Sequence, residues 1–342
     1  MCRLSENECL EKNDQLLIME CMLGASVLEK DSSCNHGRKR QTAFKLRGLI
    51  LLLTLLSGLA ISVCGAESQE AAKASKSAAV SAPEKPPWSR IVMIGASASA
   101  GFIESEPFGG PTTSKLRLNR YLDAALVTTH EPVRNYSSAM FFMKPEGQGQ
   151  SQSEQALQSN PSLLVALDYL FWFCYGDGST DRERLQRFEQ GLKFLEPFRC
   201  PLIIGDLPDA SAAVERMLTP DQIPSPAALS AANRRLKEWA SARKQTVVIP
   251  LSAFMRNAMA NKPLTVHGQT LAEGKTRVLL QDDKLHPSAA GCAVLALAIF
   301  DSFLSNETSL SSSDIRWNAK EVYHLALEPP RPANTPARSV TR

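Results

Sequence analysis

Short, continuous apolar runs alternate along this chain with segments of helical spacing, and this alternation restricts the possible folds more than any other feature. Residues 202–204 (Leu-Ile-Ile) and 247–249 (Val-Val-Ile) are typical of strands buried on both faces of a sheet. Residues 229–239, between them, place apolar side chains at helical intervals. We therefore expect an α/β fold, three-layer α/β/α and flavodoxin-like, with a mostly parallel sheet of roughly five strands. The expected strands are residues 90–95, 139–143, 163–173, 201–205 and 246–250.

The N-terminal part, residues 1–66, has the pattern of an extension followed by an export signal. A basic segment, residues 38–47, precedes an apolar run over 49–63 and then small residues ending at Ala66, which is the expected cleavage point. Residues 48–66 also approach the roughly 20 residues of a spanning helix, so an uncleaved membrane anchor is the alternative. We expect a secreted or periplasmic protein, or else an anchored one with its domain outside the cytoplasm. Membrane contact is expected only in the second case.

The remaining chain divides by composition into three parts. Residues 67–87 are rich in Ala, Ser, Lys, Glu and Pro, which predicts a flexible linker. Residues 88–305 form one expected domain, and residues 306–342, with serine-rich and proline-rich stretches, form an expected low-complexity tail. The 38 basic and 35 acidic side chains nearly balance, and nothing in their number indicates a nucleic-acid partner.

Two motifs far apart in the sequence carry chemistry. The segment Gly-Ala-Ser-Ala-Ser-Ala-Gly over residues 95–101 follows the first expected strand and places Ser97 just beyond its end. The segment Asp-Lys-Leu-His-Pro over residues 283–287 precedes the last strongly apolar helix. Because ligands bind beyond the carboxyl ends of parallel strands, both segments are expected at one edge of the sheet.

Their residue types suit nucleophilic catalysis. A serine hydroxyl needs a histidine to take its proton, and a carboxylate that fixes the histidine tautomer makes the histidine effective. Asp283 and His286 have the spacing to form such a pair facing Ser97, with Asp282 as a neighbouring competitor. The spacing does not fit a Gly-x-Gly-x-x-Gly phosphate loop or a P-loop lysine, and Ser99 breaks the Gly-x-Ser-x-Gly elbow.

At these residues the chain resembles the SGNH/GDSL hydrolase family. Its first block, Gly-Asp-Ser-x-Ser/Thr-x-Gly, matches residues 95–101 except that Ala96 replaces the Asp, and its last block, Asp-x-x-His-Pro, matches residues 283–287. The resemblance spans residues 88–305 in block order. It implies a three-layer α/β/α fold and hydrolysis of esters or transfer of acyl groups. It also implies Ser97 as nucleophile, His286 as base and Asp283 as its orienting group.

The same resemblance implies an oxyanion hole made of the nucleophile's backbone N–H, a glycine after the second strand and an asparagine after the third. Gly147 and Gly149 are the candidates for the glycine. The asparagine has no counterpart, and the polar residues available are Asp168, Tyr175 and Asp177. Of these, Asp168 ends a strongly apolar run, and we favour a structural or substrate-contacting role for it.

The function expected from the sequence is an exported serine hydrolase that cleaves carboxylic esters through an acyl-enzyme. This chemistry needs no metal and no organic cofactor. The expected partner is a small-molecule or carbohydrate ester. A catalytically silent SGNH-like binding module and an O-acyltransferase are the alternatives.

Overall fold

A computed structural model describes residues 86–176, 180–306 and 311–328 of the chain. The expected N-terminal extension, export signal and nearly all of the linker lie outside these residues, as do Asp177 and the last part of the expected tail. The fold and the site described below consist of these residues only.

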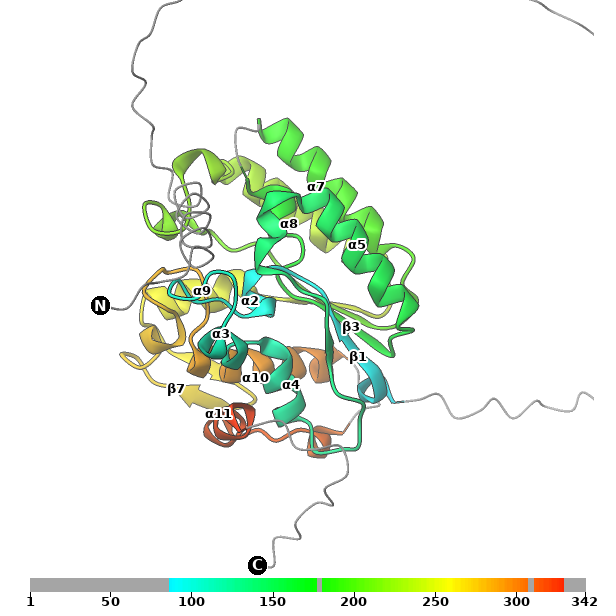
Figure 1. The fold of residues 1–342 in the computed structure, drawn as a ribbon, viewed down its shortest axis with the longest axis vertical. Helices are drawn as coiled ribbons and strands as arrows, with labels where there is room; N and C mark the ends of the chain where they lie inside the picture. Colours follow the sequence, from blue (N-terminus) through cyan, green and yellow to red (C-terminus); the bar gives the residue numbers. More distant parts are fainter. Residues whose placement is uncertain (1–85, 177–179, 307–310, 329–342) are drawn as a thin grey trace, which may run out of the picture. The chain divides into compact units, whose positions relative to one another are not determined.

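A five-stranded parallel sheet with the order β2-β1-β3-β4-β5 forms the centre of the fold (Figure 1). Its neighbouring strands pair in parallel throughout. This is the flavodoxin-like order, in which the direction of strand addition reverses between β1 and β3. The expected fold class is therefore confirmed. The strands are β1 (Ile91–Met93), β2 (Arg134–Asn135), β3 (Leu163–Ala166), β4 (Leu202–Gly205) and β5 (Thr246–Ile249), with a separate antiparallel pair β6 (Leu264–Val266) and β7 (Gln269–Leu271).

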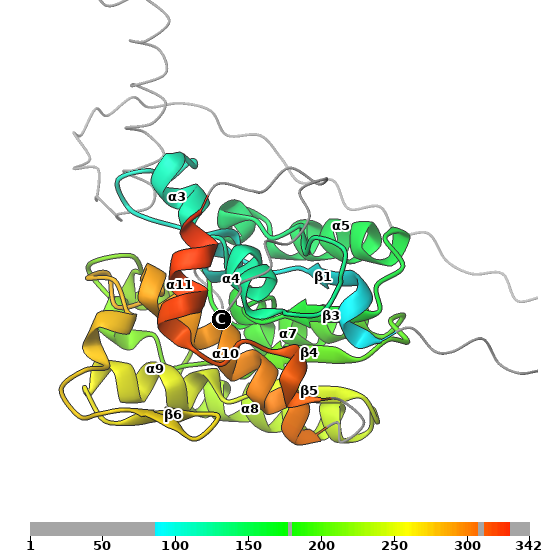
Figure 2. The same cartoon turned by 90° about the horizontal axis from the view of Figure 1, so that it is seen from below.

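Helices cover both faces of the sheet (Figures 1 and 2). One face carries α5 (Pro145–Gln158), α7 (Asp181–Leu195) and α8 (Pro226–Ser241), and the other carries α4 (Leu118–Ala125), α10 (Ala289–Asn306) and α11 (Ala319–Leu327). Shorter helices are α2 (Ser97–Ala100), α3 (Pro111–Lys115), α6 (Phe171–Cys174) and α9 (Leu251–Met259). The 3-10 helices are η1 (Pro87–Arg90), η2 (Ala139–Met143), η3 (Ser211–Ala213), η4 (Pro220–Gln222), η5 (Arg277–Leu279) and η6 (Ser312–Asp314).

Helix α10 is apolar on nearly all of its faces. Among the described helices it has the length and hydropathy of a membrane span. Its side chains are mostly buried, and it packs against α4, α11 and β5. A helix that is apolar on all sides is typical of a protein core, and α10 is such a core helix.

Two of the expected strands are wrong in extent or place. The expected strand 163–173 ends at Ala166, because the chain turns at Asp168, whose carbonyl accepts the N–H of Phe171 as α6 begins. Residues 139–143 form a 3-10 helix, started by the Ser138 hydroxyl, which accepts the N–H of Met140. The second strand is instead β2, a short polar edge strand that a search for apolar runs misses.

The domain also extends beyond residue 305, where we expected a low-complexity tail to begin. Helix α11 packs against α4 and α10 and buries Val322 and Ala326, which lie four residues apart on one face. Asn318 caps its first turn, and Arg120 donates to the Ala326 carbonyl at its end. The serine-rich and proline-rich flanks hide this short amphipathic helix in the sequence.

Candidate active site

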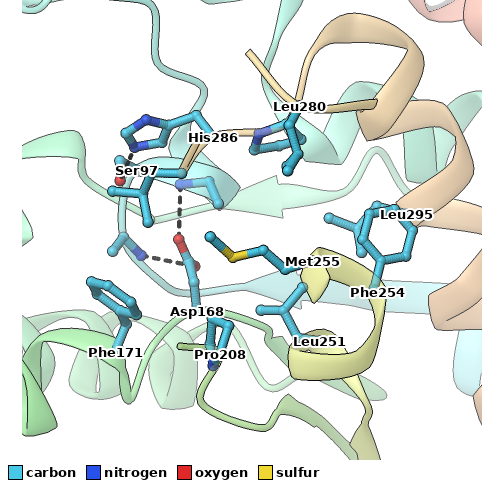
Figure 3. Close-up of a pocket in the computed structure, with 14 residues that line it drawn as sticks. Ser97, Asp168, Phe171, Pro208, Leu251, Phe254, Met255, Leu280, His286 and Leu295 are labelled. Atoms are coloured by element: carbon cyan, nitrogen blue, oxygen red, sulfur yellow. Dashed lines mark hydrogen bonds between the residues drawn. The ribbon is translucent and has the colours of Figure 1, made fainter. Parts of the chain in front are cut away.

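The turn that carries Ser97 lies at the carboxyl end of β1, beside the point where strand order reverses. Figure 3 shows the Ser97 side chain next to His286. Ser97 is the first residue of α2, and Gly95, two residues earlier, has a φ of 155°, a conformation that residues with a side chain rarely adopt. The side-chain amide of Gln152 holds Gly95 at both backbone groups, accepting its N–H at 2.8 Å and donating to its carbonyl at 3.1 Å. A buried side chain of α5 therefore fixes the backbone at the start of the turn that carries Ser97.

Ser97, His286 and Asp283 form a continuous hydrogen-bonded chain, although His286 lies 189 residues after Ser97. The Nε2 atom of His286 lies 2.7 Å from Ser97 Oγ, and its Nδ1 atom lies 2.7 Å from Asp283 Oδ2. An ionised carboxylate accepts only, so Nδ1 carries the proton and Nε2 is free to accept the serine hydroxyl. This is the arrangement that activates a serine.

The loop around Asp283 holds the carboxylate in place. Asp283 Oδ1 accepts the backbone N–H groups of Leu285 at 2.9 Å and His286 at 3.0 Å. Lys284, between Asp283 and Leu285, has a φ of 59°, the left-handed conformation that bends the chain back over the carboxylate. Asp282 is exposed, so of the two neighbouring carboxylates the loop turns Asp283 toward the histidine.

Burial shapes the electrostatics of this pair. The side chains of His286 and Asp283 are 3% and 4% exposed, and Phe102 packs on the imidazole with 4.4 Å between ring centroids. Burial alone raises the pKa of Asp283, but the hydrogen bond and charge of His286, with the backbone N–H donors, lower that pKa overall. Asp283 is therefore ionised at neutral pH.

Asp168, two residues after the end of β3, accepts four hydrogen bonds from the turn that carries Ser97. Its Oδ1 accepts the Ala96 N–H at 3.0 Å and the Ser99 hydroxyl at 2.6 Å. Its Oδ2 accepts the N–H groups of Ala98 at 2.8 Å and Ser99 at 3.2 Å. An acceptor in this role cannot donate to an oxyanion, so the structure favours the structural role among the two expected for Asp168.

One N–H of the turn is not used by Asp168. The N–H of Ser97 lies between the groups that Asp168 binds, and as the first N–H of α2 it has no acceptor within the helix. An N–H at this position can donate to an oxyanion formed on the same residue. Tyr175, another polar residue considered for this role, donates instead to the Pro208 carbonyl at 2.6 Å.

Neither expected oxyanion glycine is at the site. Gly147 and Gly149 lie within α5, where we expected a loop after a strand. Gly149 is buried against Phe173 and Tyr169, and its carbonyl accepts the Tyr169 hydroxyl at 2.9 Å. The misplaced second strand caused this error, since residues 145–150 follow η2 and not β2.

Three contributors to the site were not expected as such from the sequence. Ser99 occupies a fixed position of the first block, which was a usable signal for its bond to Asp168. Phe102 follows that block directly. Gln152 lies in a polar helix with no local feature that points to Gly95, and only long-range packing reveals it.

Substitution of Gly95 tests how closely Asp168 approaches the turn. A Cβ on Gly95 would lie 2.2 Å from Asp168 Oδ1 and 2.8 Å from Ser99 Oγ, so Gly95→Ala is expected to destabilise the protein by about 2–3 kcal/mol. Gly147→Ala is the matched control, because a Cβ there has nothing within 4 Å and alanine favours the helix by about 0.5–1 kcal/mol. Urea unfolding measures the free energy of unfolding of both variants. A change of the same sign in both would contradict the close packing of Asp168 against Gly95.

Fold and site together define a class: an α/β protein with a serine–histidine–aspartate chain at the reversal point of a parallel sheet. Both blocks that resemble SGNH/GDSL hydrolases lie at this edge of the sheet. No protein-family model matches the chain, and no curated protein sequence matches it.

Solved structures similar to the chain include three named as hydrolases. A lipase/acylhydrolase from Enterococcus faecalis has 19% identity and a TM-score of 0.39, covering 62% of this chain and 93% of that chain. Axe2, an acetylxylan esterase from Geobacillus stearothermophilus, has 18% identity and a TM-score of 0.40, and the match covers 64% of this chain and 93% of Axe2. A GDSL-like lipase from Bacteroides thetaiotaomicron has 13% identity and a TM-score of 0.38, and the match covers 65% of this chain and 89% of the lipase. Likeness of fold does not decide a reaction, which is argued below from the site.

Proposed function

We propose that this protein is an exported serine hydrolase that cleaves carboxylic esters. The observation that carries the proposal is the chain from Asp283 through His286 to Ser97, with both hydrogen bonds at 2.7 Å. The proposed roles are nucleophile for Ser97, general base and acid for His286, and orienting carboxylate for Asp283. Export is inferred from the N-terminal sequence pattern, and it makes extracellular esters, including acylated carbohydrates, the substrates to test.

The geometry supports a two-step reaction. Ser97 Oγ attacks the ester carbonyl carbon while its proton passes to His286 Nε2, and the Ser97 N–H donates to the resulting oxyanion. The bond from carbon to the alcohol oxygen then breaks, and Nε2 returns the proton to that oxygen. Water repeats the sequence on the acyl-enzyme, which releases the carboxylic acid and restores Ser97.

The missing asparagine lowers the expected rate without removing the mechanism. Loss of one oxyanion donor typically costs about 3 kcal/mol, or some 10²–10³ in rate. Rate enhancement by a complete serine site is far larger than this factor. We therefore expect a slow but Ser97-dependent esterase.

A fluorophosphonate probe tests the proposal, because it forms a stable covalent bond with an activated serine and does not require the natural substrate. We expect labelling of the Ser97 peptide in mass spectrometry and no labelling of Ser97→Ala. Ser114, a half-buried serine in α3, serves as control, since Ser114→Ala should label like the native protein. A native protein that stays unlabelled while correctly folded would favour the silent binding module.

A further inference from the structure

An apolar pocket opens beside Ser97 and extends away from it between α9, α10 and the loop before α10 (Figure 3). Its cavity volume is about 50 Å³. The side chains that enclose it come from segments far apart in sequence, and most are nearly fully buried. They include Phe171, Leu251, Phe254, Met255, Leu280 and Leu295.

The part of the wall next to the nucleophile offers little to a polar ligand. Ala96 contributes a methyl group there, where the SGNH first block has an aspartate, and it is 1% exposed. Asp168 also borders the pocket, but both of its carboxylate oxygens are already engaged by N–H and hydroxyl groups of the Ser97 turn. A hydroxyl-bearing group that entered would lose its hydration with little compensation.

The position of the pocket decides which half of an ester it fits. The acyl carbon is bonded to Ser97 Oγ in the acyl-enzyme, so the acyl group stays beside Ser97 through both steps. The alcohol must instead reach His286 Nε2, leave, and be replaced by water. A pocket lined by apolar side chains suits the group that stays and not the one that exchanges with water.

We propose, on the basis of the esterase function above, that this pocket binds the acyl group and selects short, apolar acyl chains of about two to four carbon atoms. Its cavity volume of about 50 Å³ is roughly one third of the ~150 Å³ of a cavity that accommodates benzene, which has six carbon atoms. Met255 determines the depth, because its side chain extends from α9 toward Asp168 across the pocket (Figure 3).

The chain-length profile of p-nitrophenyl esters tests this assignment on the full-length protein. We expect the highest kcat/KM for acetate or butyrate and a value about 100-fold lower for octanoate, since the extra methylenes have no room. A flat profile, or a maximum at octanoate, would overturn the pocket assignment while leaving the esterase function in place. Absence of any Ser97-dependent hydrolysis would instead contradict the esterase function itself.

Substitutions at Met255 test the depth of the pocket. Met255→Ala should raise kcat/KM for the hexanoate ester about 10-fold relative to that for the butyrate ester. Met255→Phe should lower kcat/KM for the butyrate ester by a similar factor relative to that for the acetate ester. Met259→Ala is the matched control, because Met259 lies one turn later on α9, packs on the core and does not line the pocket. Thermal melting verifies that each variant is folded. Folded Met255 variants with the native profile would refute the assignment.

Discussion

Replacing Ser97 with alanine is expected to lower kcat for ester hydrolysis about 10⁶-fold, the effect typical of removing the nucleophile from a serine site. The reason is geometric: Ser97 Oγ is the atom 2.7 Å from His286 Nε2, and alanine has no group for the histidine to activate. Initial rates on p-nitrophenyl acetate measure the loss, with melting temperature as a check that the fold survives.

Ser99 provides the matched control for this substitution, since it lies two residues away in the same helix. Its hydroxyl is fully buried and donates to Asp168 Oδ1, away from the histidine. Ser99→Ala removes one supporting hydrogen bond, and we expect kcat to fall about 10-fold or less. If the two alanine variants lost activity equally, the assignment of Ser97 as nucleophile would be wrong.

The second large effect is expected for Asp283→Asn, with a loss of about 10⁴-fold in kcat. The backbone N–H groups of Leu285 and His286 both donate to Oδ1, so the asparagine oxygen should take that place. Its amide NH₂ then faces His286 Nδ1, which must become an acceptor. The proton moves to Nε2, and the imidazole can no longer take the proton of Ser97.

Asp282→Asn is the control for this experiment, because Asp282 is the adjacent carboxylate and is exposed. Its substitution should leave kcat within about 2-fold, as expected for a surface site away from the chemistry. Nitrogen-15 NMR of the imidazole can observe the tautomer directly in both variants. Retention of the native tautomer in Asp283→Asn, with unchanged kcat, would contradict the role proposed for Asp283.

Local sequence pattern predicted much of the sheet. Strands β4 and β5 lie within their expected ranges, because both contain short runs of consecutive branched apolar residues. The edge strand β2 was missed, since its residues Arg134 and Asn135 have no apolar signal and their strand conformation depends on pairing with β1. Helix α11 was missed for a similar reason: its stability comes from packing on α4 and α10.

The candidate site divides in the same way. Ser97, Asp283 and His286 could be named in advance because each belongs to a short motif whose spacing has chemical meaning. The glycine candidates failed because their assignment depended on where the second strand ended. Gln152 could not be named, since no motif marks it and its contact with Gly95 exists only because α5 packs beside the Ser97 turn.

Residue identities and short spacings were therefore sufficient for the fold class and for the three residues of the hydrogen-bonded chain, because buried strands and an Asp-x-x-His pair depend mainly on neighbouring residues. Folding of the whole chain determined that Asp168 accepts from the Ser97 turn and that an apolar pocket opens beside the nucleophile. Those features depend on which side chains from β3, α9 and α10 occupy the space around Ser97, and packing in three dimensions sets that arrangement.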